Sequence, residues 1–587
     1  MAAQSGFEFD LQKMQASSQY LCEAIEWLAA NPRNYDSVHH ELDVPKLSSM
    51  VDCLKPAVSK MQRLQNRYSL INRLPPEVLI QIFHLLMNPF LPAALSHSDR
   101  RTTLARIIRQ RAWITRVCHY WRETALHTMK LWGLVWVHNP WGTWGNSYNE
   151  LCFRRSGNAP LNVHVTVKKY NSPLLRDVMS QMHRVQDLHF LHLRDDPFAS
   201  AGANVDTSQL KSLVFSCRGH QLPPEWSELF ASKSDVWQSS SIRTLAFNRY
   251  TDWKQCRITN LRHLIIANQA FDAPSASCLL VVLSNNPRLE DLILSKVWVR
   301  SGDRLDLDAV IASHQVVAMP HLKRLAVDSK NSSRWLTHDI SARWHMMSEF
   351  LEAMIVQPDG CLVHHRPNMT STPAIPKFRS TLAIRRLEIT YRSWTGTDGQ
   401  SAFRIADRSL MRNINEHPQR FLRPTNSAQN VQELWVDDFK FADRAIADWT
   451  TVLQDMCNVT KLVLRPHFLR ELSTLQWWLG TIARYGLFPS LSELEVHKHT
   501  ASHALDILAL IEKRRANGTR MSTLRFVRWL NSENEEGAFE YMKSYSERFK
   551  TSVVHVLFED VSEEPFMPLP ELCTTPSPVH DHWEPWR

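Results

Sequence analysis

The residues best suited to metal chemistry lie in the segment HKHTASH, which contains His497, His499 and His503. His499 and His503 are four residues apart, and two imidazoles at that spacing on a helix are how some zinc sites begin. No Glu lies between these histidines, and no further ligand is identifiable around them. A chain with 27 His is expected to contain such clusters by accident. We therefore expect no metal site here.

The sequence motifs of cofactor and nucleophile chemistry are missing as well. No two of the 15 Gly stand in a G-x-G arrangement, so the dinucleotide fingerprint is absent, and there is no Walker-type phosphate loop. No G-x-S-x-G elbow occurs, and no carboxylate pair stands out among the 59 acidic residues. The 10 Cys include no C-x-x-C pair, which is typical of reduced and mostly buried thiols. We therefore expect no cofactor and no catalytic residue, and hence a protein that is not itself an enzyme.

The composition is that of a folded chain with a sizeable core. Of 587 residues, 44% are hydrophobic and 22% are charged. Lys and Arg outnumber Asp and Glu by 68 to 59, a net charge of +9, but no run of like charges is long enough to form a nucleic-acid arm. No stretch of about 18 apolar residues occurs, and the start of the chain lacks a basic signal region. We expect no nucleic-acid partner, no membrane association, and a cytoplasmic or nuclear location.

The first part of the chain is predicted to be helical. Residues 1–69 form a helical lead-in, with helical spacing over 11–30 and again over about 46–70. The segment LPPEVLIQIFHLL begins at Leu74, and its two prolines suit the first turn of a short helix. After a polar loop, a further helix is predicted from about 104 to 126.

Beyond residue 150 a short phrase of the form apolar-x-x-Leu-x-apolar returns again and again. Its neighbours favour a strand, and helical patterns long enough for a crossover connection separate many of its copies. The intervals between its central leucines run from 19 to 62 residues, and the longest is close to twice 31. The central leucines are 188, 213, 245, 264, 292, 325, 387, 434, 462, 494 and 524. We predict an α/β fold in which these strands pair in parallel, with Leu245, Leu264, Leu292, Leu462 and Leu494 in one continuous core.

The segment from Leu74 to Leu86 and the later run RVCHYWRETALHTMKLW resemble the two halves of an F-box, in the family's order. The family's LPxE opening and its V-C-x-x-W-R and Leu-Trp features are all present. They stand at Leu74, Pro75, Glu77, Val117, Cys118, Trp121, Arg122, Leu131 and Trp132. The connection between the halves is longer than usual, as in F-box-like proteins of fungi, and this leaves the packing of the adaptor face open.

The F-box resemblance implies a helical module over residues 70–135 that binds a Skp-type adaptor and, through it, cullin and RING subunits. A unit of this size also cannot enclose all of its large apolar side chains, so some must face outward or meet a partner. The residues expected to contact the adaptor are Leu74, Pro75, Glu77, Ile80, Ile82, Val117 and Trp121. The alternative is a helical hairpin that only caps the region after it.

The repeated phrases resemble the strand portion of leucine-rich repeats, which predicts an irregular repeat-like solenoid of strand-helix units over 150–560. The array departs from the family because the intervals are wide and the Asn or Cys at the ninth position is absent. One non-repeating α/β domain, or two smaller domains, would fit the same pattern. The resemblance implies substrate-binding residues at the variable positions of the phrase, with no preference for an acidic or basic ligand. These are His189, Arg243, Arg262, Glu290, Lys323, Arg386, Glu433 and Glu495.

Two further segments complete the organisation. A tryptophan-rich patch begins at the end of the F-box-like run and suits a core role at a module junction, or else an exposed recognition surface. It comprises Trp132, Trp136, Trp141 and Trp144. Residues 561–587 contain six prolines and no apolar period, which predicts a flexible tail.

Taken together, the resemblances imply the substrate-recognition subunit of an SCF-type cullin-RING ubiquitin ligase, which binds an unidentified protein substrate for ubiquitin-dependent degradation. The alternatives are a scaffold that binds the adaptor without directing ubiquitination and, more remotely, an enzyme with an unrecognised site in the C-terminal region.

Overall fold

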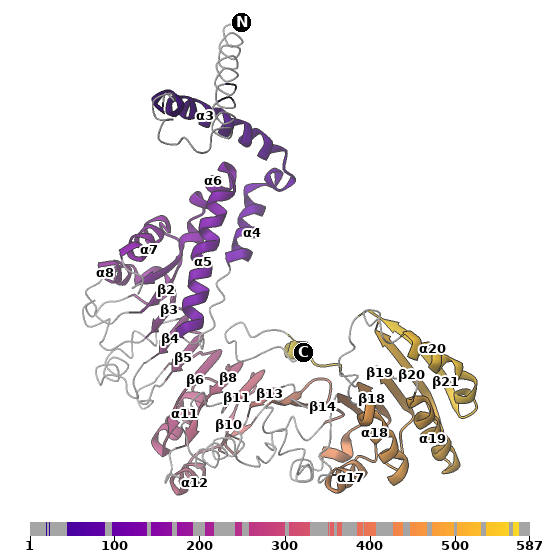
Figure 1. Cartoon of the computed structure of the whole chain (residues 1–587). Helices are drawn as coiled ribbons and strands as arrows, with labels where there is room; N and C mark the ends of the chain where they lie inside the picture. Colours follow the sequence, from indigo (N-terminus) through magenta and orange to yellow (C-terminus); the bar gives the residue numbers. More distant parts are fainter. Residues whose placement is uncertain are drawn as a thin grey trace, which may run out of the picture. The chain divides into compact units, whose positions relative to one another are not determined.

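The structure is a computed structural model of the whole chain (Figure 1), and it describes most of the residues from 44 to 574. The described residues are 19, 23, 44–87, 97–137, 143–166, 173–191, 206–216, 241–248, 258–299, 304–328, 350–351, 353–356, 361–366, 384–390, 393–406, 427–437, 446–465, 472–497, 502–529, 536–562 and 567–574. Most of the helix predicted over 11–30 lies outside them.

The chain divides into two compact units. The first comprises Met1–Pro89, Arg101–Gly133 and Arg155–Gly157, and the second comprises Phe90–Arg100, Leu134–Arg154 and Asn158–Arg587. Each unit therefore includes a short segment whose neighbours in sequence belong to the other unit. A single cut of the chain near residue 135 or 150 would leave part of one unit attached to the other.

The first unit is helical in its described residues. Its elements are α3 (Val44–Tyr68), the 3-10 helix η1 (Leu70–Arg73), α4 (Pro76–Met87), α5 (His97–Val117, which belongs to this unit from Arg101 on), α6 (His119–His127) and the 3-10 helix η2 (Met129–Trp132). The predicted single helix over 104–126 is wrong, because Cys118 is extended (φ −159°, ψ 174°) and its sulfur accepts a hydrogen bond from the Trp121 N–H. Cys118 thus ends α5 and caps the start of α6.

The second unit is a mixed α/β structure built on one large sheet. From one edge to the other, the strands follow the order β1 (Leu134–Val137), β2 (Leu161–Val165), β3 (Val185–Leu191), β4 (Ser212–Ser216), β5 (Thr244–Asn248), β6 (His263–Ala267), β8 (Asp291–Ser295), β11 (Arg324–Asp328), β13 (Leu362–Arg366), β16 (Ala402–Ala406), β15 (Ser393–Thr397), β14 (Arg386–Thr390), β17 (Glu433–Asp437), β18 (Lys461–Arg465), β19 (Glu493–His497), β20 (Met521–Trp529) and β21 (Val553–Val561). Every pairing is parallel except the two that β15 makes.

The parallel pairing and the shared core of the phrase strands are confirmed. Leu245 pairs with Leu264, which pairs with Leu292, and Leu462 pairs with Leu494. All five belong to one continuous buried cluster. Beside them, Phe190, Phe215 and Phe247 stack with ring centroids 5.5 and 5.9 Å apart. Identical side chains on neighbouring strands thus form ladders through the core.

Helices cover one side of the sheet, as Figure 1 shows for α11 (Ala273–Ser284), α12 (Arg304–Ser313) and α17 (Ile446–Asp455). The remaining helices of this unit are α7 (Thr143–Arg155), α8 (Pro173–Ser180), η3 (Met182–Arg184), η5 (Ser427–Asn430), α18 (Leu472–Tyr485), α19 (His503–Ala516), α20 (Glu536–Ser544), α21 (Ser546–Lys550) and α22 (Glu571–Thr574). Two small parallel pairs, β7 (Ala270–Phe271) with β9 (Trp298–Val299) and β10 (Val317–Ala318) with β12 (Ile355–Val356), lie outside the large sheet. In the described part of the chain, no helix combines the length and the apolar character needed to cross a membrane.

The wide interval after Leu325 is explained by a strand that the phrase does not match. β13 lies within it, and its Val363 pairs with Leu325 where the phrase would require leucine. The three strands that follow in sequence run back through the sheet in reverse order as an antiparallel meander. Within it Gly396 stands opposite Phe403, whose ring occupies the space that any Cβ at Gly396 would need.

The tryptophan-rich segment takes the core role where the structure describes it. Trp132 is buried in the first unit and donates its indole N–H to the Ala125 carbonyl (2.9 Å). Trp136 is buried in the second unit and donates to the Thr166 hydroxyl (3.0 Å). The side chains of Trp141 and Trp144 lie outside the described residues.

Candidate functional site

Two hydrogen bonds join the later F-box-like run to the start of the first F-box-like segment and to the 3-10 helix η1 just before it. The Trp121 indole N–H donates to the Asn72 side-chain oxygen (2.7 Å), and the Tyr120 hydroxyl donates to the Leu74 carbonyl (2.9 Å). Leu74 ends η1 and precedes α4, whereas Tyr120 and Trp121 lie on α6. These bonds fix the entry of α4 against α6 across 46 and 49 residues of sequence.

Trp121 lies inside this unit and not on its surface. Its side chain is 9% exposed, and its ring centroid lies 5.1 Å from that of Phe83, which is fully buried. In this unit Trp121 has little exposed surface to offer a partner. A buried indole with a satisfied N–H positions the neighbouring helices.

The other residues expected to contact an adaptor are at least partly accessible. Leu74, Ile80 and Ile82 are half-buried. Pro75, Glu77 and Val117 are exposed. The same unit also exposes large apolar side chains that were not predicted as adaptor contacts. They are Tyr68, Leu70, Ile71, Val78, Leu85, Leu86 and Trp113.

Leu70 is 78% exposed and Leu85 is 77% exposed. Large apolar side chains so accessible on a small helical unit mark a surface suited to a protein partner. For Val78, Leu85 and Leu86 the signal was in the sequence of α4, which is polar only at Glu77, Gln81 and His84 and so cannot bury all of its apolar side chains against one neighbour.

The second candidate surface is the side of the large sheet opposite the leucine core. Side chains alternate between the two sides of a strand, so the residues before and after each core leucine share the opposite side. His189, Arg386, Glu433 and Glu495 hold such positions within their strands. Arg243, Arg262, Glu290 and Lys323 instead come just before their strands, at the edge where the strands begin. Sequence reasoning grouped these two sets although they occupy different places.

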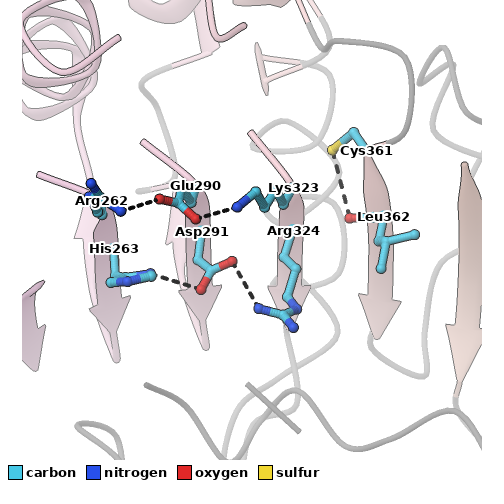
Figure 2. Close-up of polar contacts among 8 residues, drawn as sticks. All are labelled: Arg262, His263, Glu290, Asp291, Lys323, Arg324, Cys361 and Leu362. Carbon is cyan, nitrogen blue, oxygen red and sulfur yellow. Dashed lines mark hydrogen bonds and ion pairs between the residues drawn. The ribbon is translucent and has the colours of Figure 1, made fainter. Parts of the chain in front are cut away.

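Three of the edge residues form one ion-pair cluster, drawn in Figure 2. Glu290 pairs with Arg262 (3.1 Å) and with Lys323 (2.6 Å) on the strands on either side. Burial alone would raise the pKa of Glu290, but the hydrogen bond from Lys323 and the nearby cations hold it below its usual value. The remaining edge residue, Arg243, is exposed.

A second row lies one residue further along the same strands. Asp291 contacts His263 (2.9 Å) and Arg324 (3.4 Å), and Asp291 is fully buried (Figure 2). Sequence reasoning missed this row because it took the second position of these three phrases, whereas the third position begins the strand and faces the side of the sheet opposite the leucine core, here called the open side. Reading each phrase with the two-residue period of a strand would have found it.

A longer row of charges crosses the other half of the sheet. Glu433 pairs with Arg386 (2.9 Å) and Lys461 (3.4 Å), and Lys461 also reaches Glu495 (3.5 Å). Arg525 on β20 extends the row, because it pairs with Glu495 (3.8 Å) and with Glu559 on β21 (3.5 Å). The signs alternate, so this surface presents no single charge to a ligand.

Trp435 lies in the middle of this row. Its indole N–H donates to Glu433 (2.9 Å), and the Lys461 ammonium and Arg465 guanidinium lie 5.6 and 4.9 Å from its ring centroid. Such an arrangement holds a flat apolar ring among charges that neutralise one another.

His189 and Asp187 on β3 occupy the same side of the sheet near its other end. His189 is buried, with its ring centroid 4.2 Å from that of His164. Burial raises the pKa of Asp187 to about 6, although nearby Lys211 opposes the shift. The amide of Asn162 on β2, in the orientation that satisfies both side chains, donates to the Asp187 carboxylate (2.9 Å).

Replacing Asp187 with Asn should increase the free energy of unfolding near neutral pH, by about 3 kcal/mol at most. The folded chain keeps the Asp187 proton to about pH 6, whereas the unfolded chain releases it near 3.8, so ionisation of Asp187 destabilises the fold as pH rises through this window. The Asn162 hydrogen bond offsets part of this cost. Urea unfolding across the pH range should show the difference growing from acid to neutral, whereas D177N, at an exposed aspartate of α8, should not change it.

The histidine cluster HKHTASH does not assemble in the residues that the structure describes. His497 is buried and bonds to Glu495 (2.7 Å), while His503 is buried at the start of α19. His499 lies outside the described residues. Among the described residues no group of three or more His, Cys, Asp or Glu is placed to hold a metal ion.

No protein-family model matches the chain, and a search of curated proteins finds none similar to it.

Proposed function

We propose that this chain is the substrate-recognition subunit of a cullin-RING ubiquitin ligase, acting in the cytoplasm or the nucleus. Its helical unit would serve as the F-box that binds a Skp-type adaptor, and its sheet would serve as a leucine-rich-repeat-like array that holds a protein substrate. The observation that carries the proposal is the packing of the later F-box-like run on the entry to α4, through the hydrogen bonds Trp121–Asn72 and Tyr120–Leu74, in a unit that exposes apolar residues.

The sheet supports the second half of the proposal. Nearly every strand along the sheet pairs in parallel with the strand before it, and the central leucines of these strands stack in one row. The open side of the same strands carries polar and apolar side chains in register. Repeats that stack in this way present a long surface to a protein partner.

The proposed mechanism is proximity. Ubiquitin transfer is performed by the partner subunits, and the chain raises the effective concentration of the target near them. No catalytic group of its own is needed for this role.

The test is affinity purification of the tagged full-length chain, followed by identification of the bound proteins. We expect the adaptor, cullin and RING subunits to co-purify, together with substrates that accumulate when the proteasome is inhibited. Adaptor without cullin or ubiquitin conjugates would favour the alternative of a scaffold. A folded chain that retains no adaptor would contradict the F-box assignment.

A further inference from the structure

The open side of the large sheet carries a row of apolar side chains as well as charges. Five of them lie in direct register on β4, β5, β6, β8 and β11, and two more lie on β13 and β16. They are Val214, Ala246, Ile265, Ile293, Ala326, Leu362 and Ala402. All seven are buried, and they belong to a cluster separate from the leucine core.

The C-terminal segment 567–574 packs against this row. Cys573 belongs to the same cluster and is fully buried, and Leu569 packs against it. Leu569 also packs against a second cluster, in which Met567 is buried with Trp435 and Val463. The segment therefore contacts both halves of the sheet, on the side opposite the leucine core. The predicted flexible tail does not describe these residues.

The contacts of this segment are those of a bound peptide. Met567, Leu569 and Cys573 face the sheet, while Pro568 and Glu571 are exposed. Pro568 and Pro570 have no backbone N–H to give to a strand, and the segment lies over the side of the sheet and not at its edge. Recognition therefore rests on the apolar side chains and their spacing.

Burial also lowers the reactivity of the Cys573 thiol in this segment. It raises the pKa of the Cys573 thiol to about 12, although the nearby Arg324 and Arg404 guanidinium groups oppose the shift. A thiol held in this state reacts slowly with alkylating reagents, because the thiolate is the nucleophile. Alkylation of Cys573 therefore reports whether the segment is in place.

We propose that residues 567–574 are a built-in peptide ligand of the open side of the sheet, and that the substrates of this surface carry a proline-containing peptide with apolar side chains at the same spacing. Such a peptide binds by displacing the C-terminal segment. That these peptides belong to substrates rests on the proposed function, whereas the peptide-binding site itself does not.

The test uses a fluorescent synthetic peptide with the sequence of residues 563–577, EEPFMPLPELCTTPS, under reducing conditions. The chain shortened after Ser562 should bind it saturably, and the full chain should bind it at least about tenfold more weakly, because its own segment competes. A control peptide with Asp at the positions of Met567 and Leu569 keeps the length and the prolines, and it should not bind.

The full chain with both M567D and L569D tests the same point without removing residues. It should gain peptide binding, and alkylation of Cys573, followed by mass spectrometry, should accelerate about tenfold or more. Unchanged protection of Cys573 in the folded variant, or equal binding of the control peptide, would overturn the inference. Adaptor binding in the same preparations tests the proposed function separately, since the adaptor contacts lie in the helical unit.

Discussion

Replacing Leu74 and Pro75 together with alanine should weaken binding of the Skp-type adaptor more than about tenfold. Pro75 is exposed and Leu74 is half-buried at the entry to α4. The contact that Leu74 makes with Tyr120 uses the backbone carbonyl and survives in the variant. The substitution therefore removes apolar surface from the proposed interface while the helices keep their positions. Titration of purified adaptor against the full-length variant measures the effect.

A matched control keeps this result interpretable. Met61 on α3 is an exposed apolar residue of the same unit, and M61A should leave adaptor affinity within about twofold of that of the parent chain. Circular dichroism should give the same helix content for both variants. A folded L74A/P75A chain with undiminished adaptor affinity would contradict the F-box assignment.

Replacing Arg465 with Met should lower the free energy of unfolding of the sheet by about 3–5 kcal/mol. Arg465 on β18 is buried and pairs with Glu388 on β14 and with Asp437 (4.0 Å) on β17. Methionine fills much of the space but leaves both carboxylates without this cation. Denaturant unfolding of the full chain, followed by tryptophan fluorescence, measures the loss.

The pH dependence separates lost charge from lost packing. Burial raises the pKa of Glu388 even with Arg465 opposing the shift, so removing Arg465 raises it further. Protonation then relieves the buried charge, and the deficit of R465M should shrink as the pH falls. The double variant E388Q/R465M should recover part of the stability at neutral pH. A deficit that is equal at all pH values and persists in the double variant would assign the effect to packing alone.

Much of the sheet could be predicted because its strands are short, buried and centred on leucine. The phrase around Leu264 or Leu494 combines an apolar period with residues that favour strands, and that signal is local. β13 was missed because Val363 takes the place of leucine. The meander was missed because the local hairpin signal between β15 and β16, Asp398-Gly399 with Gly399 at φ 101°, was not used.

The candidate surfaces were predicted less well than the fold. Asp291 and Arg324 lie one residue away from the predicted Glu290 and Lys323, and the period of a strand decides which of them faces the open side. Trp121 resembles a contact residue in sequence, but its ring packs on Phe83, and only three-dimensional structure separates a buried indole from an exposed one. The C-terminal segment gave no signal because its partners lie throughout the preceding sheet.

The meander formed by β14, β15 and β16 divides the sheet into two runs in which each strand pairs with the strand before it in sequence. Within each run the pairings are nearest-neighbour and join segments that are close in the chain, so either run can begin to fold without the other. Joining them requires β16 to meet β13 and β14 to meet β17, with β15 between them. The meander is therefore the junction of two nearest-neighbour runs, and a strand-helix unit added to one run would leave the register of the other unchanged.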